Sequence, residues 1–374
     1  MKLKLEDVCE RGSSSLKQSD ILGMTGDYPI YGASGYIGNV DFYHQEKPYV
    51  AIVKDGAGIG RTTFHTAKSS VIGTMQYLLP KDNVLPKYLY YVVGHMHLEK
   101  YFSGATIPHI YFKDYKSEEF NYDSLDKQKN IVETLGRCEK VISARKRELE
   151  LLDSLIKARF VEMFGDENNP QNWDIINVED VADVQVGVVI KPSQYYTDKG
   201  NGVKAFRSLN IGEGFIKDNE WVYFTEEGHK KNSKSIVKEN DLLIVRSGAP
   251  GTACVVTQKY IGYNAIDIII VHPDCKKVNP YYLCCYTNMP HGKKQINEGI
   301  GGAAQQHFNV GKYNKLRLML PPKELQDEFA AFVHQVDKSI LLSLIKLLEQ
   351  LITYLYNVFI IYRQDKGEEV EKYE

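Results

Sequence analysis

Side chains able to contact a nucleic acid stand beside glycine-containing or strand-like segments in both halves of this 374-residue chain. Arginine and lysine donate hydrogen bonds to guanine edges and to phosphates, amides pair with adenine, and glycine lets a backbone approach closely. The side chains in such settings are candidates for contact with a nucleic acid, and they are Tyr31, Ser34, Tyr36, Lys54, Arg61, His109, Arg207, Ser208, Asn210, Arg246, Gln305 and Gln306.

Each of these groups also has a purely structural interpretation. The charged residues could be solvated side chains beside tight connections between strands. The tyrosines could be half-buried residues of a hairpin, and the histidine and the glutamines could dock a domain onto a helix. The sequence alone leaves these alternatives open.

No arrangement of residues in the sequence predicts catalysis. The glycines of residues 56–60 lack the G-x-G-x-x-G spacing of a dinucleotide site, and no P-loop occurs. Residues 279–282 (NPYY) lack the second proline of the NPPY motif of adenine methyltransferases. His95 and His97 have no further Cys or His at ligand spacing, so we predict no metal site. We expect a chain that catalyses nothing alone and uses no cofactor.

Two long helices must position the candidate residues. Apolar side chains recur at steps of three or four through residues 123–165 and again through residues 323–363. Forty residues of helix make a rod of roughly 60 Å, at 1.5 Å per residue. The near-heptad spacing predicts that the two rods pair as a coiled coil.

The two mixed segments that precede the rods are related by an internal repeat. The offset between matching positions drifts only from 192 (52 to 244) to 198 (128 to 326). Matches in one order indicate a duplicated unit of one domain and one rod. The matching segments are IVKDGA at 52–57 with IVRSGA at 244–249, PKYL at 86–89 with PYYL at 280–283, Gly104, Ala105, His109 and Tyr115 with Gly302, Ala303, His307 and Tyr313, and Gln128 with Gln326.

The charge balance limits how the chain could bind DNA. Residues 1–123 carry 13 Lys and Arg against 14 Asp and Glu, and residues 166–322 carry 18 against 17. Neither segment is basic overall, so DNA binding would require local basic patches.

Two features of the sequence bear on where the protein is located and whether it enters a membrane. Six cysteines without C-x-x-C pairs are typical of reduced thiols, and we predict a cytoplasmic protein. Residues 340–362 are long and apolar enough to suggest a membrane span, but Lys346 and Glu349 lie near their middle. A helix buried against its coiled-coil mate and a partner subunit is the preferred interpretation.

Three motifs give the chain a resemblance to the specificity subunits of type I restriction-modification systems. They are GATIPHI at 104–110, the Q-x-x-I-V opening at 128–132, and LDSLIKARFVEMFG at 152–165. The second repeat departs from the first, because residues 302–308 read GAAQQHF. The resemblance covers essentially the whole chain.

The resemblance implies a fold class and a set of domains. We expect an α+β chain, in which two α/β target recognition domains are separated by two long helices paired as an antiparallel coiled coil, with a pseudo-two-fold internal repeat. The expected parts are a first recognition domain (1–122), a first spacer helix (123–165), a second recognition domain (166–322), and a second helix with a polar tail (323–374). Within the first domain we expect a strand over 70–79 and a helix over 86–102.

The resemblance also implies a function. Each domain would read one half of a split, asymmetric site in double-stranded DNA, with the helices as a ruler between the halves. Two methylation subunits would dock on the helices and nearby surfaces to methylate adenine, and motor-nuclease subunits would cleave unmethylated DNA. The alternative is a coiled-coil adaptor without DNA specificity.

Overall fold

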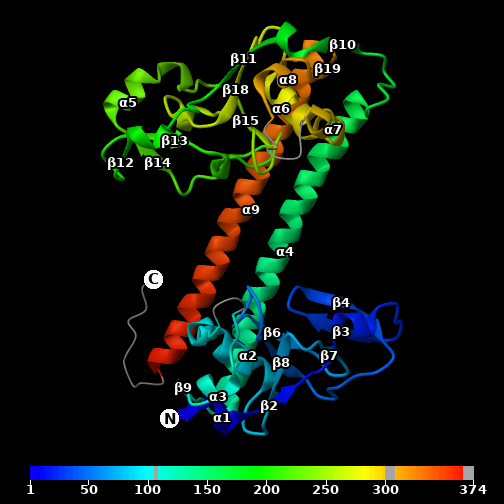
Figure 1. Ribbon diagram of the computed structural model, residues 1–374, viewed down its shortest axis with the longest axis vertical. Helices are drawn as coiled ribbons and strands as arrows, with labels where there is room; N and C mark the ends of the chain where they lie inside the picture. Colours follow the sequence, from blue (N-terminus) through cyan, green and yellow to red (C-terminus); the bar gives the residue numbers. More distant parts are fainter. Residues whose placement is uncertain (105–107, 300–307, 365–374) are drawn as a thin grey trace. The chain divides into compact units, whose positions relative to one another are not determined.

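The computed structural model describes residues 1–104, 108–299 and 308–364, and the side chains of these residues as far as 349. The chain divides into two compact units. Unit 1 comprises residues 1–143 and 347–374, and unit 2 comprises residues 144–346. Each unit contains three small sheets, short helices and parts of two long helices (Figure 1).

Unit 1 is built around a buried central strand. Its four-stranded antiparallel sheet has the order β2 (Cys9–Ser13), β8 (Met75–Pro80), β5 (Tyr49–Val53), β6 (Thr62–His65). A three-stranded sheet has the order β4 (Gly35–Val40), β3 (Tyr28–Gly32), β7 (Ser70–Val71), and a two-stranded sheet pairs β1 (Lys2–Lys4) with β9 (Glu119–Asn121). The helices of this unit are α1 (Leu5–Val8), α2 (Pro86–His95) and α3 (Phe112–Tyr115).

The strand β5 is buried on both faces, which explains its uninterrupted apolar sequence. Val50 and Ile52 belong to the core that includes side chains of α2, whereas Tyr49, Ala51 and Val53 belong to a second core on the other face. Burial on two faces makes this strand the centre of unit 1.

Unit 2 repeats the three sheets. The order β11 (Ala182–Val186), β18 (Ile268–Pro273), β15 (Leu242–Val245), β16 (Ala253–Val255) corresponds to the four-stranded sheet of unit 1. A second sheet has the order β12 (Tyr196–Thr197), β14 (Val222–Phe224), β13 (Val203–Phe206), β17 (Asn264–Ala265), and β10 (Asp174–Asn177) pairs with β19 (Arg317–Leu320). The helices are α5 (Glu226–Lys231), α6 (Pro280–Asn288), α7 (Pro290–Gly299) and α8 (Val310–Asn314).

The repeat predicted from the sequence is confirmed by contacts that recur in both units. Strand β3 pairs with β7 in parallel, as β13 does with β17. The Ile110 amide donates to the Lys54 carbonyl at 3.0 Å, and the Phe308 amide donates to the Arg246 carbonyl at 3.0 Å. Equivalent residues therefore make equivalent backbone bonds.

Two buried glutamines perform the same task in the two units. Gln128 Oε1 accepts from the Leu85 amide, and Gln326 Oε1 accepts from the Asn279 amide, each at 2.8 Å. Leu85 and Asn279 directly precede α2 and α6, so each glutamine ties the first turn of a long helix to the start of a domain helix. Both glutamines are fully buried.

The long helices are α4 (Leu125–Phe164) and α9 (Lys323–Gln364). Within unit 2 they run antiparallel side by side, because Phe160 contacts Phe329 while Glu148, further back along α4, accepts from the Ser343 hydroxyl at 3.0 Å. Gly165 ends α4 in a left-handed conformation (φ 84°) that glycine adopts without steric cost. The predicted fold class is confirmed.

One element ends earlier than the sequence predicted, and another is interrupted. The helix expected over 86–102 stops at His95, because His97 adopts a left-handed backbone (φ 52°) that a helix cannot continue. The strand expected over 70–79 is divided into β7 and β8 by a turn in which the Met75 amide donates to the Ile72 carbonyl at 3.0 Å.

No helix among the described residues is both long and apolar enough to cross a membrane.

The substitution Gln326→Leu tests the contact between long helix and domain. It leaves the Asn279 amide without its acceptor and the Pro321 carbonyl without its donor. We expect the free energy of unfolding to fall by about 1–3 kcal/mol, measured by urea denaturation. Gln335→Leu, at an exposed position of the same helix, is the matched control. Equal stability of the two variants would contradict the assignment.

His65 makes unit 1 sensitive to acid. Its ring stacks on Tyr49 with centroids 5.1 Å apart, and burial lowers its pKa from 6.5 to about 4. Between these values the unfolded chain binds a proton that the folded chain excludes, so stability is lost as pH falls through this window. The loss is at most on the order of 3 kcal/mol. We expect His65→Gln to flatten the dependence of urea unfolding on pH between 6.5 and 4.5, whereas His95→Gln, at an exposed position, keeps the wild-type slope.

Candidate nucleic-acid interface

In unit 1 the hairpin of β3 and β4 presents one group of candidate residues. Ala33 and Ser34 form the turn, and Gly35 follows with a φ of 111° that favours glycine. Ser34 is exposed, and Tyr36 is 62% exposed beside the ring of Tyr31, with centroids 6.0 Å apart. The hairpin therefore carries a hydroxyl and an aromatic face to the surface.

Arg61 joins this hairpin from the loop that follows β5. Its guanidinium donates to the carbonyl of Ala33, which brings an exposed cation to the turn although the two residues are far apart in sequence. Arg61 also lines a surface groove of about 810 Å³ together with Gly58, Tyr90 and Tyr91. A cation beside a hydroxyl and an aromatic face is suited to contact phosphate and base edges.

Lys54 and His109 form a second group in unit 1. The His109 Nδ1 lies 2.7 Å from the Asp55 Oδ1, and the Lys54 Nζ lies 3.6 Å from the Asp55 Oδ2. The two side chains thus share one carboxylate. This arrangement ties the segment before α4 to the loop after β5, and it partly neutralises the charge that Lys54 offers to an anion.

In unit 2 most of the candidate side chains are occupied inside the protein. Asn210 is fully buried, and its amide donates to the carbonyls of Asn219 and Lys217 at 2.7 and 3.4 Å. The Arg246 side chain is 15% exposed and bonds Asp267 at 2.5 Å and the Phe308 carbonyl at 3.1 Å. These contacts point to a positioning role, because they leave the side chains few free groups for DNA.

Arg207 and Ser208 lie at the start of the same connection. An Arg207 terminal nitrogen donates to the Glu220 carbonyl at 2.6 Å, and Ser208 is partly exposed. Gln305 and Gln306 lie outside the described residues. The structure therefore groups Arg207, Ser208 and Asn210 with each other, and Arg246 with the segment that precedes α9.

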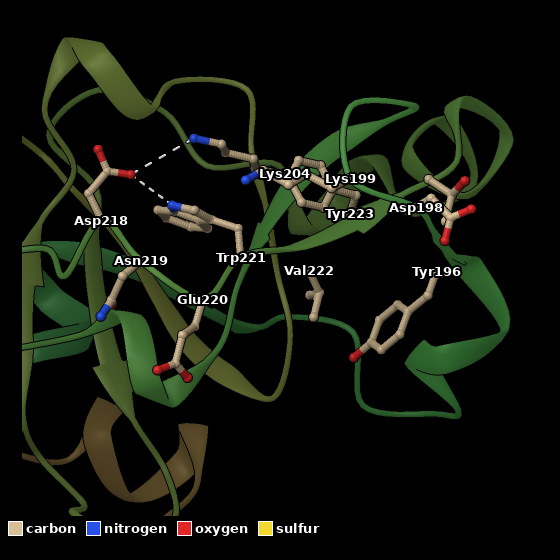
Figure 2. A pocket seen from close by; sticks show the side chains of 11 residues that line it. Tyr196, Asp198, Lys199, Lys204, Asp218, Asn219, Glu220, Trp221, Val222 and Tyr223 are labelled. Atoms are coloured by element: carbon tan, nitrogen blue, oxygen red, sulfur yellow. Dashed lines mark hydrogen bonds and ion pairs between the residues drawn. The ribbon is translucent and has the colours of Figure 1, made fainter. Parts of the chain in front are cut away.

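A groove in unit 2 contains residues that sequence reasoning missed (Figure 2). It has a volume of about 570 Å³ and lies between residues 196–199 and residues 218–223, with Lys204 beside them. The Lys204 ammonium lies 5.2 Å from the centre of the Trp221 ring and 3.8 Å from an Asp218 carboxylate oxygen. Polar and acidic residues are followed directly by aromatic ones in the sequence DNEWVYF at 218–224, and that signal could have identified the groove.

Electrostatic pairing organises this groove. The Asp218 carboxylate accepts from Lys259 and from the Trp221 indole, the latter at 2.7 Å. The hydrogen bond from the Lys259 ammonium is the main reason that the pKa of Asp218 lies below its usual value, and the hydrogen bond from the Trp221 indole is the second. Asp218 is therefore an internal anchor that stays ionised, while Tyr196, Lys199, Asn219 and Glu220 remain exposed at the rim.

Comparison with known proteins adds to this geometry. The family of the type I restriction modification DNA specificity domain matches residues 1–152 and 170–352. The MjaVIII and MjaIX specificity subunits of type I restriction enzymes from Methanocaldococcus jannaschii are 21% and 20% identical. The first alignment spans 78% of this chain and 72% of that protein, and the second spans 71% and 65%.

A solved structure shares the fold. The S subunit of a type I restriction-modification system from M. genitalium aligns over 95% of this chain and 93% of its own, with a TM-score of 0.61 and 14% identity. With family matches across both repeats, the chain belongs to the DNA specificity subunits of type I restriction-modification systems, which do not catalyse reactions themselves, and so is part of a complex that binds DNA.

Proposed function

We propose that each unit reads one half of a split, asymmetric DNA site, and that the chain directs adenine methylation by two methylation subunits. Motor-nuclease subunits join this complex in the cytoplasm to cleave unmethylated DNA. The observation that carries the proposal is the duplicated sheet arrangement with unlike loops. The turn of Ala33 and Ser34 joins β3 to β4, whereas residues 207–221 join β13 to β14 at the equivalent place.

Reading an asymmetric site requires different loops, and here they are held by the same arrangement of sheets. The shared framework holds each loop in the same local setting, while different side chains select different bases. Unit 1 offers Ser34, Tyr36 and Arg61 there, and unit 2 offers the groove beside Trp221. Two identical loops would read two identical half-sites.

Phosphate contacts must be local, because neither recognition domain is basic overall. Exposed lysines of unit 2 such as Lys199, Lys217 and Lys230 can each neutralise a phosphate, but acidic residues lie among them. This balance favours modest DNA affinity for the isolated chain and further phosphate contacts from the methylation subunits.

Exposed apolar side chains support docking of those subunits on the helices. Leu151 and Leu155 of α4 and Leu341 and Ile345 of α9 are 43–61% exposed, whereas Phe160 and Phe164 of α4 and Phe329 of α9 are fully buried. Such side chains typically mark an interaction surface.

The proposal is tested by purifying the chain with its cognate methylation subunits and sequencing the methylated adenines in a random plasmid library. We expect a single motif of two short specified halves separated by an unspecified spacer. Removing seven residues from each of α4 and α9 should shorten the spacer and leave both halves unchanged, because each helix spans about 1.5 Å per residue. A contiguous motif, or altered halves in the shortened variant, would contradict the proposal.

Partner docking has its own test. The double substitution of Leu341 and Ile345 by glutamate places two charges one helical turn apart on the exposed surface of α9. We expect association with a methylation subunit, measured by analytical size exclusion, to weaken at least tenfold. Ile190→Glu changes an equally apolar, 79% exposed residue outside the helices and should leave association unchanged. Equal association of both variants would place the docking surface elsewhere.

A further inference from the structure

The connection between β13 and β14 in unit 2 holds a rigid tip. Asn210, which is fully buried, donates to the carbonyls of Lys217 and Asn219, and Arg207 donates to the carbonyl of Glu220. The Asn210 carbonyl also accepts from the Lys217 amide at 2.8 Å. Side chains at the start of the connection therefore fix the backbone at its end.

The backbone at this tip is strained. Glu220 has a φ of 50°, in the left-handed region that non-glycine residues rarely adopt. Such a conformation costs on the order of 1–3 kcal/mol and persists only where surrounding contacts impose it. The bond from Arg207 to the Glu220 carbonyl supplies one such contact. Glycine would relieve the strain, but it would also remove the carboxylate from the rim of the groove.

The side chains of the tip are free to act on a ligand. Asn219 and Glu220 are exposed, and within the part of the chain that the structure describes neither side chain has a hydrogen-bond partner. Figure 2 shows them next to each other, pointing away from the Asp218 carboxylate. Their immediate neighbours, Asp218 and Trp221, are by contrast bonded to each other. The internal contacts of the loop thus leave two adjacent polar groups available.

Their chemistry matches base edges in the DNA major groove. An asparagine amide donates and accepts, as the N7 and N6 positions of adenine require, and a glutamate accepts from the N4 amino group of cytosine. A carboxylate near phosphates is otherwise repelled, so Glu220 is useful on a DNA-facing loop only where an amino group offsets its charge. Lys199 lines the same groove and is exposed, so it can contact the adjoining phosphate.

We propose that Asn219 and Glu220 are specificity-determining residues, which read adjacent bases in the half-site that unit 2 recognises. This inference rests on the proposed function and deepens it, because it names the side chains and their preferred partners, adenine for Asn219 and cytosine for Glu220. Arg207 and Asn210 are then positioning residues that hold the reading loop.

The test uses the full chain in complex with its cognate methylation subunits. Methylated motifs are sequenced from a random plasmid library for the wild type and for Asn219→Ala and Glu220→Gln. A bidentate contact discriminates by about 1–3 kcal/mol, so we expect the preference for adenine to fall roughly 5–150-fold in Asn219→Ala. The preference for cytosine should fall in Glu220→Gln. The loss should affect one or two adjacent positions of one half-site and leave the other half unchanged. Glu220→Gln should also bind non-target DNA more tightly, because a repulsive charge is gone.

Glu239→Gln is the matched control, since Glu239 is also an exposed loop glutamate of unit 2 and does not line the groove. It should keep the wild-type motif, and equal thermal unfolding midpoints should show that all variants fold. A well-defined wild-type split motif that neither tip variant alters would overturn this inference alone. If the wild-type complex methylates no split motif, the proposed function fails as well.

Discussion

The structure of unit 2 depends on a hydrophobic core that its recognition sheets share with its two long helices. Phe160 and Phe164 of α4 and Phe329 of α9 are fully buried, and both α4 rings pack against Tyr282 of α6 with centroids 5.5 and 4.8 Å apart. The same core includes Ile244 of the central strand. Because interiors are close-packed, neither helix can shift without disturbing the sheet. A domain fused to its stalk in this way can transmit a fixed position to whatever it binds.

The buried glutamines add hydrogen bonds that also fix each long helix relative to its domain. A close-packed apolar core fixes the helix by shape, and a buried amide that must satisfy a backbone donor adds a second, directional constraint on its register. Gln128 and Gln326 occupy the same position at the start of each long helix. The recurrence of this bond in both units suits an architecture in which the spacing between reader and helix must be the same each time.

The two loops that we propose as DNA readers show how one framework accommodates different chemistry. In unit 1 a two-residue turn is braced by Arg61 from another loop, and the exposed groups are a hydroxyl, a phenol and a guanidinium. In unit 2 a longer connection is braced from within by Arg207 and Asn210. The residues that brace a loop differ from the residues that the loop exposes. Polar side chains of both groups look alike in the sequence.

Features that depend on residues close together in the sequence could be predicted, whereas features that depend on contacts between distant segments could not. The repeat and the two rods were predicted because helical periodicity and matched segments are local signals. The end of α2 was missed because a left-handed residue such as His97 has no reliable sequence signature. Asn210 looked like a reader because its type and position after a strand fit that role, and its complete burial was not visible. Asn219 and Glu220 were not among the predicted contacts, because the sequence does not show which polar residues beside a strand remain exposed and unpaired after folding.

The sequence by itself thus determined the duplicated order of domain and helix, the length of the rods and the family resemblance. The rods follow from local periodicity, and the repeat follows from short segments that match at an offset of 192 to 198 residues. Only the tertiary structure decided which polar side chains are consumed in holding loops and which remain exposed. That distinction depends on contacts between segments far apart in the chain, such as Arg61 with Ala33, and burial is a property of the folded neighbourhood that no residue type carries alone.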